Sequence, residues 1–378
     1  MAAPIYLDYQ ATTPLAPEAR AAMLPYLDAK FGNPHSDHRF GWEADAGVDA
    51  ARGQIAAALG VAPETVLFTS GATEAANLAI KGVLAAPGQT RRRIVTLATE
   101  HSCVLESARW LESVGAELTV LGVDAQGLVR LDELAAALGE DVAVVAVAAV
   151  NNEIGVIQPM REIAALARGV GALMFADGAQ AFGKTPLNMP DFDLLSLSAH
   201  KIYGPTGVGA LYVKPGTSLA PQQHGGGQEG NGLRSGTLSP ALCAGFGAAA
   251  QIAQAAMATD AAHVAALWDR LLAQLAEPYQ INGSPTERWR GNLNVCFPGI
   301  DGARLLADVL RDVALSSGAA CASAKGKPSH VLAALGLPEP LARATMRIGW
   351  GRFSTADEID RAAAAINRAI SAQGRRAA

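Results

Sequence analysis

Short, uninterrupted apolar runs alternate along this chain with longer stretches whose apolar residues have helical spacing. The runs predict strands buried on both faces, at residues 66–69, 94–97, 117–121, 142–150, 172–176 and 192–197. Helical spacing between them, as in Ala46–Leu59 and Met160–Arg168, predicts intervening helices. Strands that alternate with helices in this way indicate an α/β fold with a mainly parallel sheet and helices on both of its faces.

Polar residues with chemical potential follow five of these runs directly: Gly71, His101, Asn152, Asp177 and His200. The carboxyl ends of parallel strands meet at one edge of a sheet, and open α/β sheets bind their ligands there. We therefore expect these five residues to line one binding site.

The last third of the chain has a different character. Residues from Pro240 to about 275 are almost all helix-forming, which predicts a long helix that links two domains. A chain of 378 residues also exceeds the usual size of one domain. We expect a large domain at residues 15–255 and a smaller domain built from residues 1–14 and 256–378, which carries a cysteine loop at about 316–330.

Composition excludes several classes of function. Half of the residues are apolar, 17% are charged and the net charge is −5, so the chain lacks the basic surface that binds nucleic acid or anionic membranes. We find neither a signal-peptide pattern at the start nor an apolar span of about 18 residues, which predicts a cytoplasmic protein. The four scattered cysteines form no CxxC pair, so we expect neither a disulfide framework nor a metal site of the chain's own.

The strongest chemical signal is Ser198-Ala199-His200-Lys201 after one strand, with Asp177 after the strand before it. A lysine that binds an aldehyde and a carboxylate that keeps a pyridine nitrogen protonated are the two groups that pyridoxal phosphate (PLP) enzymes require. An isolated pair of this kind is more often a solvated aspartate and a surface lysine. The surrounding residues favour the cofactor site.

Hydroxyls and backbone amides suited to a phosphate accompany this pair. Ser70-Gly71-Ala72-Thr73 opens a predicted helix, where free N–H groups bind anions, although serine and threonine often serve there as ordinary caps. Ser198 and His200 add further donors. His101 suits a ring stacked on the cofactor, or else a packed histidine, and Asn152 and Gln180 can donate to the cofactor's phenolic oxygen.

Cys321 lies in Ser316–Ala324, a stretch of small residues that predicts an exposed, mobile loop and a reactive thiol. Cys243 and Cys296 lie in apolar segments and are expected in the core, and Cys103 is expected to be structural. Arg347, at the end of a short apolar strand, could bind a substrate carboxylate or form a surface ion pair.

Together these residues resemble the cysteine desulfurases, PLP enzymes of the class V aminotransferase group. The resemblance covers nearly the whole chain and rests on several long motifs: Tyr6-Leu7-Asp8-Tyr9 with Ala11-Thr12-Thr13-Pro14, Gly32-Asn33-Pro34-His35-Ser36, residues 68–74, residues 150–155, residues 198–205, Arg234-Ser235-Gly236-Thr237 and the Cys321 loop. It implies a PLP-dependent transferase of fold type I, with a mainly parallel seven-stranded sheet and a smaller α+β domain.

The resemblance also implies a role for each matching residue. Lys201 would carry the cofactor, Asp177 would pair with its ring nitrogen, and His101 would stack on the ring and act in catalysis. Asn152 and Gln180 would bond the phenolic oxygen, with Asn152 also near the substrate. Ala72, Thr73, Ser198 and His200 would bind the phosphate end, with Thr237 reaching over from a second subunit. Arg347 would bind the substrate carboxylate, and Cys321 would accept the sulfur.

The implied reaction removes sulfur from L-cysteine, gives L-alanine and leaves a persulfide on Cys321. The implied partners are a second copy of the chain and a sulfur acceptor, which could be an iron–sulfur scaffold, a nitrogenase-specific one or a tRNA-thiolation carrier. On a scaffold, Cys321 could transiently ligate a cluster. A selenocysteine lyase or an aminotransferase of the same fold is the alternative, and a catalytically silent sulfur-transfer scaffold is an alternative of another class.

Three positions depart from the family pattern. Gly230-Asn231-Gly232 replaces the usual arginine-glycine after Gly227-Gln228-Glu229 and makes the loop one residue longer. Gly349-Trp350 stands where Ser-Leu is more common beside Arg347, which we expect to tighten the substrate end. Cys103 stands where the family often has alanine.

Overall fold

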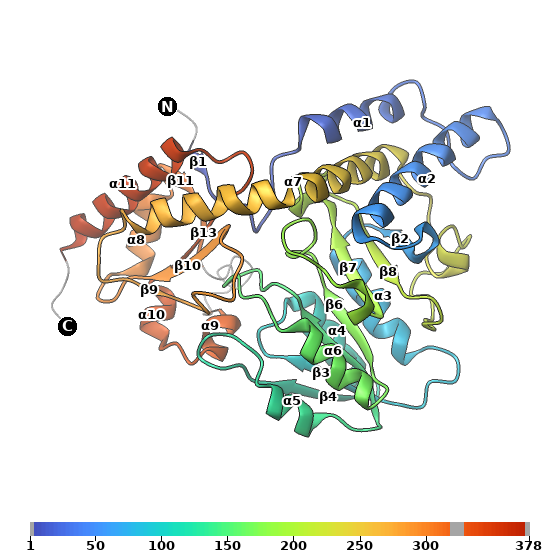
Figure 1. The fold of residues 1–378 in the computed structure, drawn as a ribbon, viewed down its shortest axis with the longest axis horizontal. Helices are drawn as coiled ribbons and strands as arrows, with labels where there is room; N and C mark the ends of the chain where they lie inside the picture. The colour runs from blue at the N-terminus through green and yellow to red at the C-terminus, as the bar shows by residue number, and fades with distance from the viewer. Residues whose placement is uncertain (1–3, 318–328, 375–378) are drawn as a thin grey trace.

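A seven-stranded sheet forms the larger half of the molecule in the computed structural model, which describes residues 4–317 and 329–374 (Figure 1). Its strand order is β2-β8-β7-β6-β5-β3-β4, and only β8 runs antiparallel to its neighbours. The strands are β2 (Val66–Thr69), β3 (Arg93–Leu97), β4 (Glu117–Leu121), β5 (Val142–Ala148), β6 (Leu173–Asp177), β7 (Leu194–Ser198) and β8 (Gly209–Val213). The predicted mainly parallel seven-stranded sheet is confirmed.

Helices cover both faces of this sheet because successive residues of a strand point to opposite sides. In β5, Val144 and Ala146 pack in the cluster that contains α3 (Ala72–Leu84) and α4 (Ser102–Ser113). Val145 and Val147 pack on the opposite face. That face is covered by α2 (Arg39–Leu59), α5 (Leu131–Ala137), α6 (Met160–Gly169) and the first half of α7 (Pro240–Leu272). The uninterrupted apolar runs of the sequence reflect this burial on both sides.

A second core lies beside the far half of α7. It surrounds a four-stranded sheet of order β12-β13-β10-β9 and the short parallel pair β1-β11. The strands are β1 (Ile5–Tyr6), β9 (Gln280–Ile281), β10 (Asn292–Cys296), β11 (Val313–Ala314), β12 (Ser316–Ser317) and β13 (Thr345–Gly349). The helices are α8 (Gly302–Val309), α9 (His330–Ala334), α10 (Glu339–Arg343) and α11 (Ala356–Gln373), while α1 (Pro17–Leu27) packs on α7 near the larger sheet. The first strand, β1, and the last helix, α11, therefore both lie on this side of the molecule (Figure 1).

Helix α7 runs past both cores and is more apolar than we expected. One of its 18-residue windows has a mean hydropathy of at least 1.2, so the prediction that no apolar span of membrane length exists was wrong. The helix packs against α1, α2 and α11, and Phe246 and Leu271 are fully buried in the two different cores. These contacts identify α7 as a core helix that fixes one sheet relative to the other.

Most element boundaries lie within two residues of the predicted ones, although α2 begins at Arg39 rather than Ala46, and three shifts matter for the site. Asp177 is the last residue of β6 rather than the residue after it, and Arg347 lies in the middle of β13 rather than at its end. Ser198 is likewise the last residue of β7. The polar groups at the sheet edge are therefore held partly by the backbone hydrogen bonds of the strands themselves.

The departure at Gly349 and Trp350 has a steric cause. A Cβ atom at Gly349 would overlap the side-chain amide of Gln10, which packs there and donates from Nε2 to the carbonyl oxygen of Gly291 at 2.8 Å. Trp350 is 1% exposed, packs against Trp268 in the second core, and donates from Nε1 to the carbonyl oxygen of Val264 at 3.0 Å. Glycine at position 349 thus leaves the space that the Gln10 side chain occupies.

Candidate functional site

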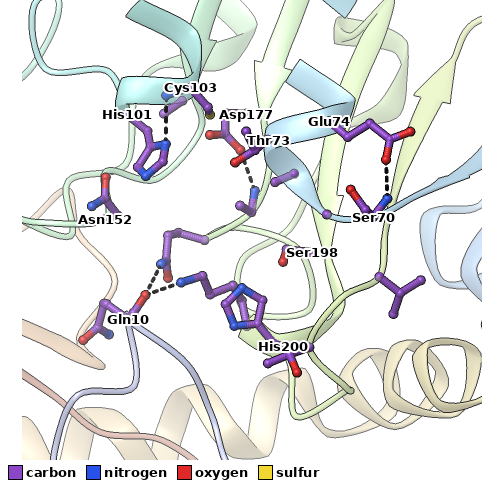
Figure 2. A pocket seen from close by; sticks show the side chains of 18 of the residues that line it. Gln10, Ser70, Thr73, Glu74, His101, Cys103, Asn152, Asp177, Ser198 and His200 are labelled. Atoms are coloured by element: carbon purple, nitrogen blue, oxygen red, sulfur yellow. Dashed lines mark hydrogen bonds between the residues drawn. The ribbon is translucent and has the colours of Figure 1, made fainter. Parts of the chain in front are cut away.

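A cavity of about 370 Å³ lies at the carboxyl edge of the parallel strands (Figure 2). Nine of the residues predicted for the cofactor line it: Ala72, Thr73, His101, Asn152, Asp177, Gln180, Ser198, His200 and Lys201. Figure 2 shows His101 and Asn152 across the cavity from Ser198 and His200. The structure therefore brings together residues that are up to 129 positions apart in the sequence, from Ala72 to Lys201.

Lys201 is held by two backbone carbonyls of the N-terminal segment. It ends a single 3₁₀ turn, Ala199–Lys201, that follows β7. Its Nζ atom donates to the carbonyl oxygen of Gln10 at 2.6 Å and to that of Ala11 at 2.7 Å. Sequence reasoning assigned no role to Gln10 or Ala11, although the motif around them was part of the family resemblance. Both residues contribute a backbone carbonyl, which every residue has, so their side-chain types do not indicate this contact.

Asp177 is fixed at the end of β6 by two hydrogen bonds to one of its oxygens. Oδ1 accepts from the hydroxyl of Ser196 at 2.7 Å and from the backbone N–H of Ala179 at 3.0 Å. Glu100 lies buried nearby, and burial together with the charge of Asp177 raises the pKa of the Glu100 carboxyl well above its ordinary value. The neutral acid is thereby favoured at Glu100, beside the Asp177 carboxylate.

His101 caps helix α4 with its own ring. Its Nδ1 atom accepts from the backbone N–H of Cys103 at 3.2 Å, so the ring proton of the neutral form belongs on Nε2. Burial lowers the pKa of His101, which favours this neutral form. A neutral imidazole that carries its proton on Nε2 can stack on a ring and exchange protons with a bound substrate.

The start of helix α3 and the residues after β7 provide a set of anion donors. The first-turn N–H groups of an α-helix have no partners within the helix, and Ala72 and Thr73 occupy this turn at the cavity wall. Ser198 and His200 line the same cavity. His200 is oriented by a 3.0 Å contact between its Nδ1 and the hydroxyl of Thr12, and burial, with the charge of Lys201, lowers the pKa of His200 to about 4.

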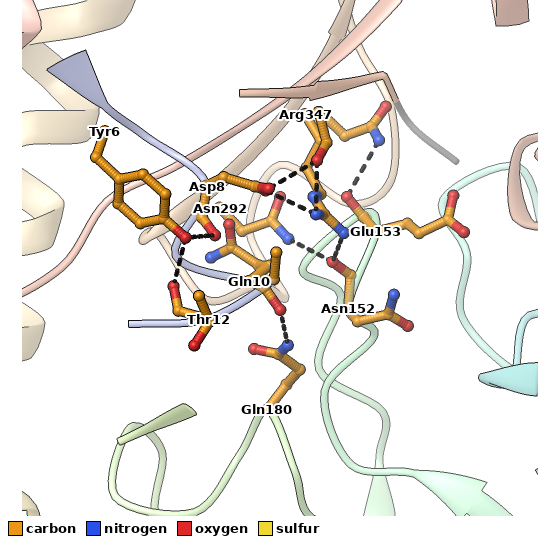
Figure 3. Close-up of polar contacts among 12 residues, drawn as sticks. Tyr6, Asp8, Gln10, Thr12, Asn152, Glu153, Gln180, Asn292 and Arg347 are labelled. Atoms are coloured by element: carbon orange, nitrogen blue, oxygen red, sulfur yellow. Dashed lines mark hydrogen bonds and ion pairs between the residues drawn. The ribbon is translucent and has the colours of Figure 1, made fainter. Parts of the chain in front are cut away.

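Two predicted residues do not line this cavity. Thr237 is exposed and does not line it. Arg347 is 4% exposed and pairs with Asp8 Oδ1 at 2.8 Å, while its guanidinium also donates to the hydroxyl of Ser316 at 3.2 Å and to the carbonyl oxygen of Asn152 at 3.3 Å (Figure 3). Its Nε atom is buried without a partner in the described residues. Arg347 therefore neighbours the cavity through Asn152 and retains one unused donor.

Cys321 lies outside the described residues, but both flanks of its segment are fastened beside the site. On one side, Ser316 donates to Asp8 Oδ2 at 2.9 Å in the network of Arg347. On the other side, Ser329 donates to the carboxylate of Glu153, and the ring of His330 contacts the carbonyl oxygen of Glu100 at 2.9 Å. Glu100 and Glu153 adjoin His101 and Asn152 in the chain, so both anchors lie next to cavity residues.

The other three cysteines are buried and remain thiols at neutral pH. Burial raises the pKa of Cys103 above its ordinary value, that of Cys243 to about 12 and that of Cys296 to about 11. The predicted core positions of Cys243 and Cys296 are confirmed. Cys103 was expected to be structural, and it is buried, but it also lines the cavity.

The donor set in this cavity fits PLP. A phosphate requires the amide and hydroxyl donors found at the start of α3 and after β7, and a pyridinium nitrogen requires a carboxylate, here Asp177. A primary amine, Lys201, and an amide donor, Gln180, complete the set, and the cavity is large enough for a small cofactor. No residue in the described lining contradicts this assignment.

Comparison with known proteins agrees with this chemistry. The family model for Aminotransferase class-V matches residues 5–362. The chain is 48% identical, over 94% of its length and 88% of the relative's, to "Cysteine desulfurase IscS" of Rickettsia akari (strain Hartford). Among solved structures, a "NIFS-LIKE PROTEIN" matches 98% of this chain and 100% of its own with a TM-score of 0.91 at 32% identity. "SspA in complex with cysteine" matches 93% of this chain and 100% of its own with a TM-score of 0.83 at 33% identity.

Borohydride reduction tests which lysine carries the cofactor. We expect protein loaded with PLP and then reduced to carry the label on Lys201, because its amine lies in the cavity with Asp177. Lys184 and Lys214 are the internal controls, since the first lies near Gln180 and the second follows strand β8. Peptide mass spectrometry locates the label. A label on Lys184 or Lys214 would show that the assignment of the cofactor amine is wrong.

Proposed function

Because the chain belongs to the class V aminotransferase family and, within it, is a PLP-dependent cysteine desulfurase, we propose that Lys201, Asp177, His101, Arg347 and Cys321 perform its reaction. The observation that supports these roles best is the shared cavity of the first three, on three different strand ends. The substrate is L-cysteine. The products are L-alanine and a persulfide on Cys321.

Each residue has one task in this proposal. PLP, when bound, supplies a protonated pyridine ring that draws electrons away from the substrate's Cα atom. Asp177 holds the proton on the ring nitrogen, for which its two hydrogen bonds at Oδ1 orient it. Lys201 moves the proton at the substrate's Cα, and neutral His101 exchanges a proton with the substrate's sulfur. Asn152 and Gln180 orient the bound molecules by hydrogen bonds from their amides.

Sulfur transfer is assigned to Cys321. Its thiolate forms a bond to the substrate's sulfur, the Cβ–S bond breaks, and the electron pair of that bond stays with the carbon skeleton, which takes up protons and leaves as alanine. Cys103, Cys243 and Cys296 are poor candidates because burial raises their pKa values. Cys321 follows Ser317 by four residues, a reach of roughly 14 Å in extended chain. This length supports access of the Cys321 thiol to the cavity, because Ser316 and Ser329, on either side of Cys321 in the chain, form hydrogen bonds beside the cavity.

The substrate's carboxylate is assigned to Arg347. A guanidinium binds a carboxylate through charge-assisted N–H bonds, and the buried Nε of Arg347 offers a donor without a partner in the described residues. The existing contact of Arg347 with Asn152, which lines the cavity, supports its nearness to the substrate. Asp8 holds the guanidinium in place meanwhile.

The Cys321→Ser variant tests the sulfur acceptor. We expect it to bind PLP normally but to release alanine more than about a hundredfold more slowly, since a hydroxyl at neutral pH is not ionised. After wild-type protein reacts with one equivalent of cysteine, mass spectrometry should find about 32 Da added to Cys321. Cys243→Ala is the matched control and should keep most of the turnover. An adduct on Cys103, or a fully active Cys321→Ser, would refute the assignment.

The Arg347→Ala variant tests the carboxylate site. We expect the KM for cysteine to rise so that kcat/KM falls by about a hundredfold, while PLP affinity changes little, because the charge-assisted contact with the substrate's carboxylate is lost. Arg352→Ala is the matched control, since Arg352 pairs with Asp260 outside the cavity lining. Steady-state kinetics of alanine formation compare the two. An unchanged KM in Arg347→Ala would move the carboxylate site elsewhere.

A homodimer accounts for features that one chain leaves unexplained. Helices α1 and α2 and the segment between them expose a group of large apolar side chains: Leu24, Leu27, Phe31, Phe40 and Trp42. Trp42 is 63% exposed, and Phe31 stacks on Phe40 at 5.4 Å. Several large apolar side chains exposed on neighbouring elements are typical of an interaction site. Thr237, which is exposed and outside its own cavity, is then available to the cavity of a second subunit.

The proposed sulfur acceptor is an iron–sulfur scaffold protein, as the IscS name of the relatives suggests. Size-exclusion chromatography with light scattering tests both the proposed dimer and the proposed acceptor. For the dimer, we expect the protein alone to have the mass of two chains. For the acceptor, we expect a larger complex after a purified iron–sulfur scaffold is added. Trp42→Glu should give single chains, since a charge in an apolar interface is unfavourable. A single-chain mass for the wild type, or no complex, would refute the corresponding proposal.

A further inference from the structure

Lys184 is a cation placed beside the cofactor cavity without an acidic partner. It follows Gln180 by four residues, in the turn after β6, where Gly183 has a φ of 68° that lets the chain turn back. Its Nζ atom donates to Gln180 Oε1 at 2.9 Å. Within the part of the chain that the structure describes, no carboxylate lies within 4 Å of it. The proposed mechanism gives Lys184 no task.

Placing a lysine here is unfavourable. Desolvation, together with a smaller repulsion from Lys201, lowers the pKa of Lys184 to about 7. The neighbouring residues that carry charge or titrate are Lys201 and, through the same electrostatic coupling, His200. A cation that is poorly solvated and repelled by its neighbours adds little to the free energy of unfolding. A role for Lys184 therefore depends on its hydrogen bond with Gln180.

That hydrogen bond determines which way the Gln180 amide faces. With a pKa of about 7, Lys184 is partly ammonium at neutral pH; in that form it has three donors and no acceptor, so it contacts only the oxygen of a carboxamide. With Oε1 turned toward Lys184, Nε2 must face the opposite side, where it donates to the carbonyl oxygen of Gln10 at 2.9 Å. This uses one of the two N–H bonds of Nε2. The second N–H remains for a group in the cavity, which Gln180 lines.

Without Lys184 the amide loses one of the two contacts that orient it, and only the hydrogen bond to Gln10 remains. The oxygen and nitrogen ends of a carboxamide are nearly equal in size, and the terminal torsion has two broad minima about half a turn apart. In the turned state the amide oxygen would face the carbonyl oxygen of Gln10 and would offer no N–H donor to the phenolic oxygen of a bound cofactor. Two facing oxygens are both acceptors, so neither contact would be a hydrogen bond. The contact with Gln10 alone also disfavours the turned state, but Lys184 adds the constraint from the other end.

We propose that Lys184 is a positioning residue, which holds the Gln180 amide in the orientation that presents an N–H donor to the ring oxygen of PLP. Lys184 touches neither substrate nor cofactor in this role and acts only through Gln180. The inference rests on the proposed cofactor site and extends it by one residue.

Titration of the cofactor-free protein with PLP tests this role without an activity measurement. We expect Lys184→Met to weaken PLP binding about tenfold, as for the loss of one positioned hydrogen bond, and to shift the visible absorption maximum of the bound cofactor. Lys184→Arg should bind PLP nearly as tightly as the wild type, because an arginine side chain also only donates hydrogen bonds and can contact Gln180 Oε1. Lys184→Gln, whose amide can donate or accept, should lie between them. Lys214→Met is the matched control, since Lys214 pairs with Asp193 at 3.1 Å, and should change neither quantity.

A double-mutant cycle separates positioning from a general structural role. If Lys184 acts only through Gln180, the double variant Lys184→Met/Gln180→Leu should bind PLP no more weakly than Gln180→Leu alone. Losses that add, or a Lys184→Met variant that binds PLP with wild-type affinity and spectrum, would overturn the inference. Thermal unfolding of each cofactor-free variant checks the fold, and Lys184→Gln carries the test if Lys184→Met does not fold. Alanine release by the wild type tests the proposed function separately.

Discussion

The site depends on one short piece of backbone, the N-terminal segment from Asp8 to Thr13, which passes between the two cores. The carbonyl oxygens of Gln10 and Ala11 hold the Lys201 amine, and the same Gln10 oxygen accepts from Gln180. Asp8 pairs with Arg347 at one end of the segment, and Thr12 and Thr13 bond His200 and its backbone at the other. Because this one segment contacts Lys201, Arg347 and His200, it fixes the relative positions of the three residues proposed to bind the cofactor and the substrate.

Low polarity at this edge of the sheet sets the protonation states of the side chains. Burial lowers the pKa values of His101, His200 and Lys184 and raises those of Glu100 and Glu153. Neutral forms are therefore favoured for the two histidines and the two glutamic acids. Asp177 has specific hydrogen-bond partners instead, since one of its oxygens accepts two hydrogen bonds. Such an environment strengthens the electrostatic interactions that a bound cofactor would form.

The departures from the family pattern show how local changes are absorbed by their neighbours. Gly349 accommodates Gln10, and the longer loop at Gly230–Gly232 uses positive φ angles at all three of its residues, which two glycines and an asparagine tolerate. Next to that loop, Glu229 keeps a bidentate pair with Arg52 at 2.8 Å and accepts from the backbone N–H of Phe68. The loop therefore changes length while its buried anchor stays fixed to α2 and β2.

The sequence by itself predicted six of the seven strands of the large sheet, the helices between them and nine residues of the cavity, because a parallel sheet buried on both faces leaves unbroken apolar runs and exposes polar groups only where the strands end. It could not place Arg347, whose position in mid-strand and pairing with Asp8 depend on contacts 339 residues apart. It could not find Gln10, Ala11 or Lys184 either, since two of them act through backbone atoms and the third through the orientation of another side chain. The apolar character of α7 has a tertiary cause as well, because that helix is buried in two cores at once. The type of a residue indicates whether it is buried and what chemistry it can perform. Which distant group it contacts, as Lys201 contacts the carbonyl of Gln10 and Arg347 contacts Asp8, depends on the tertiary structure.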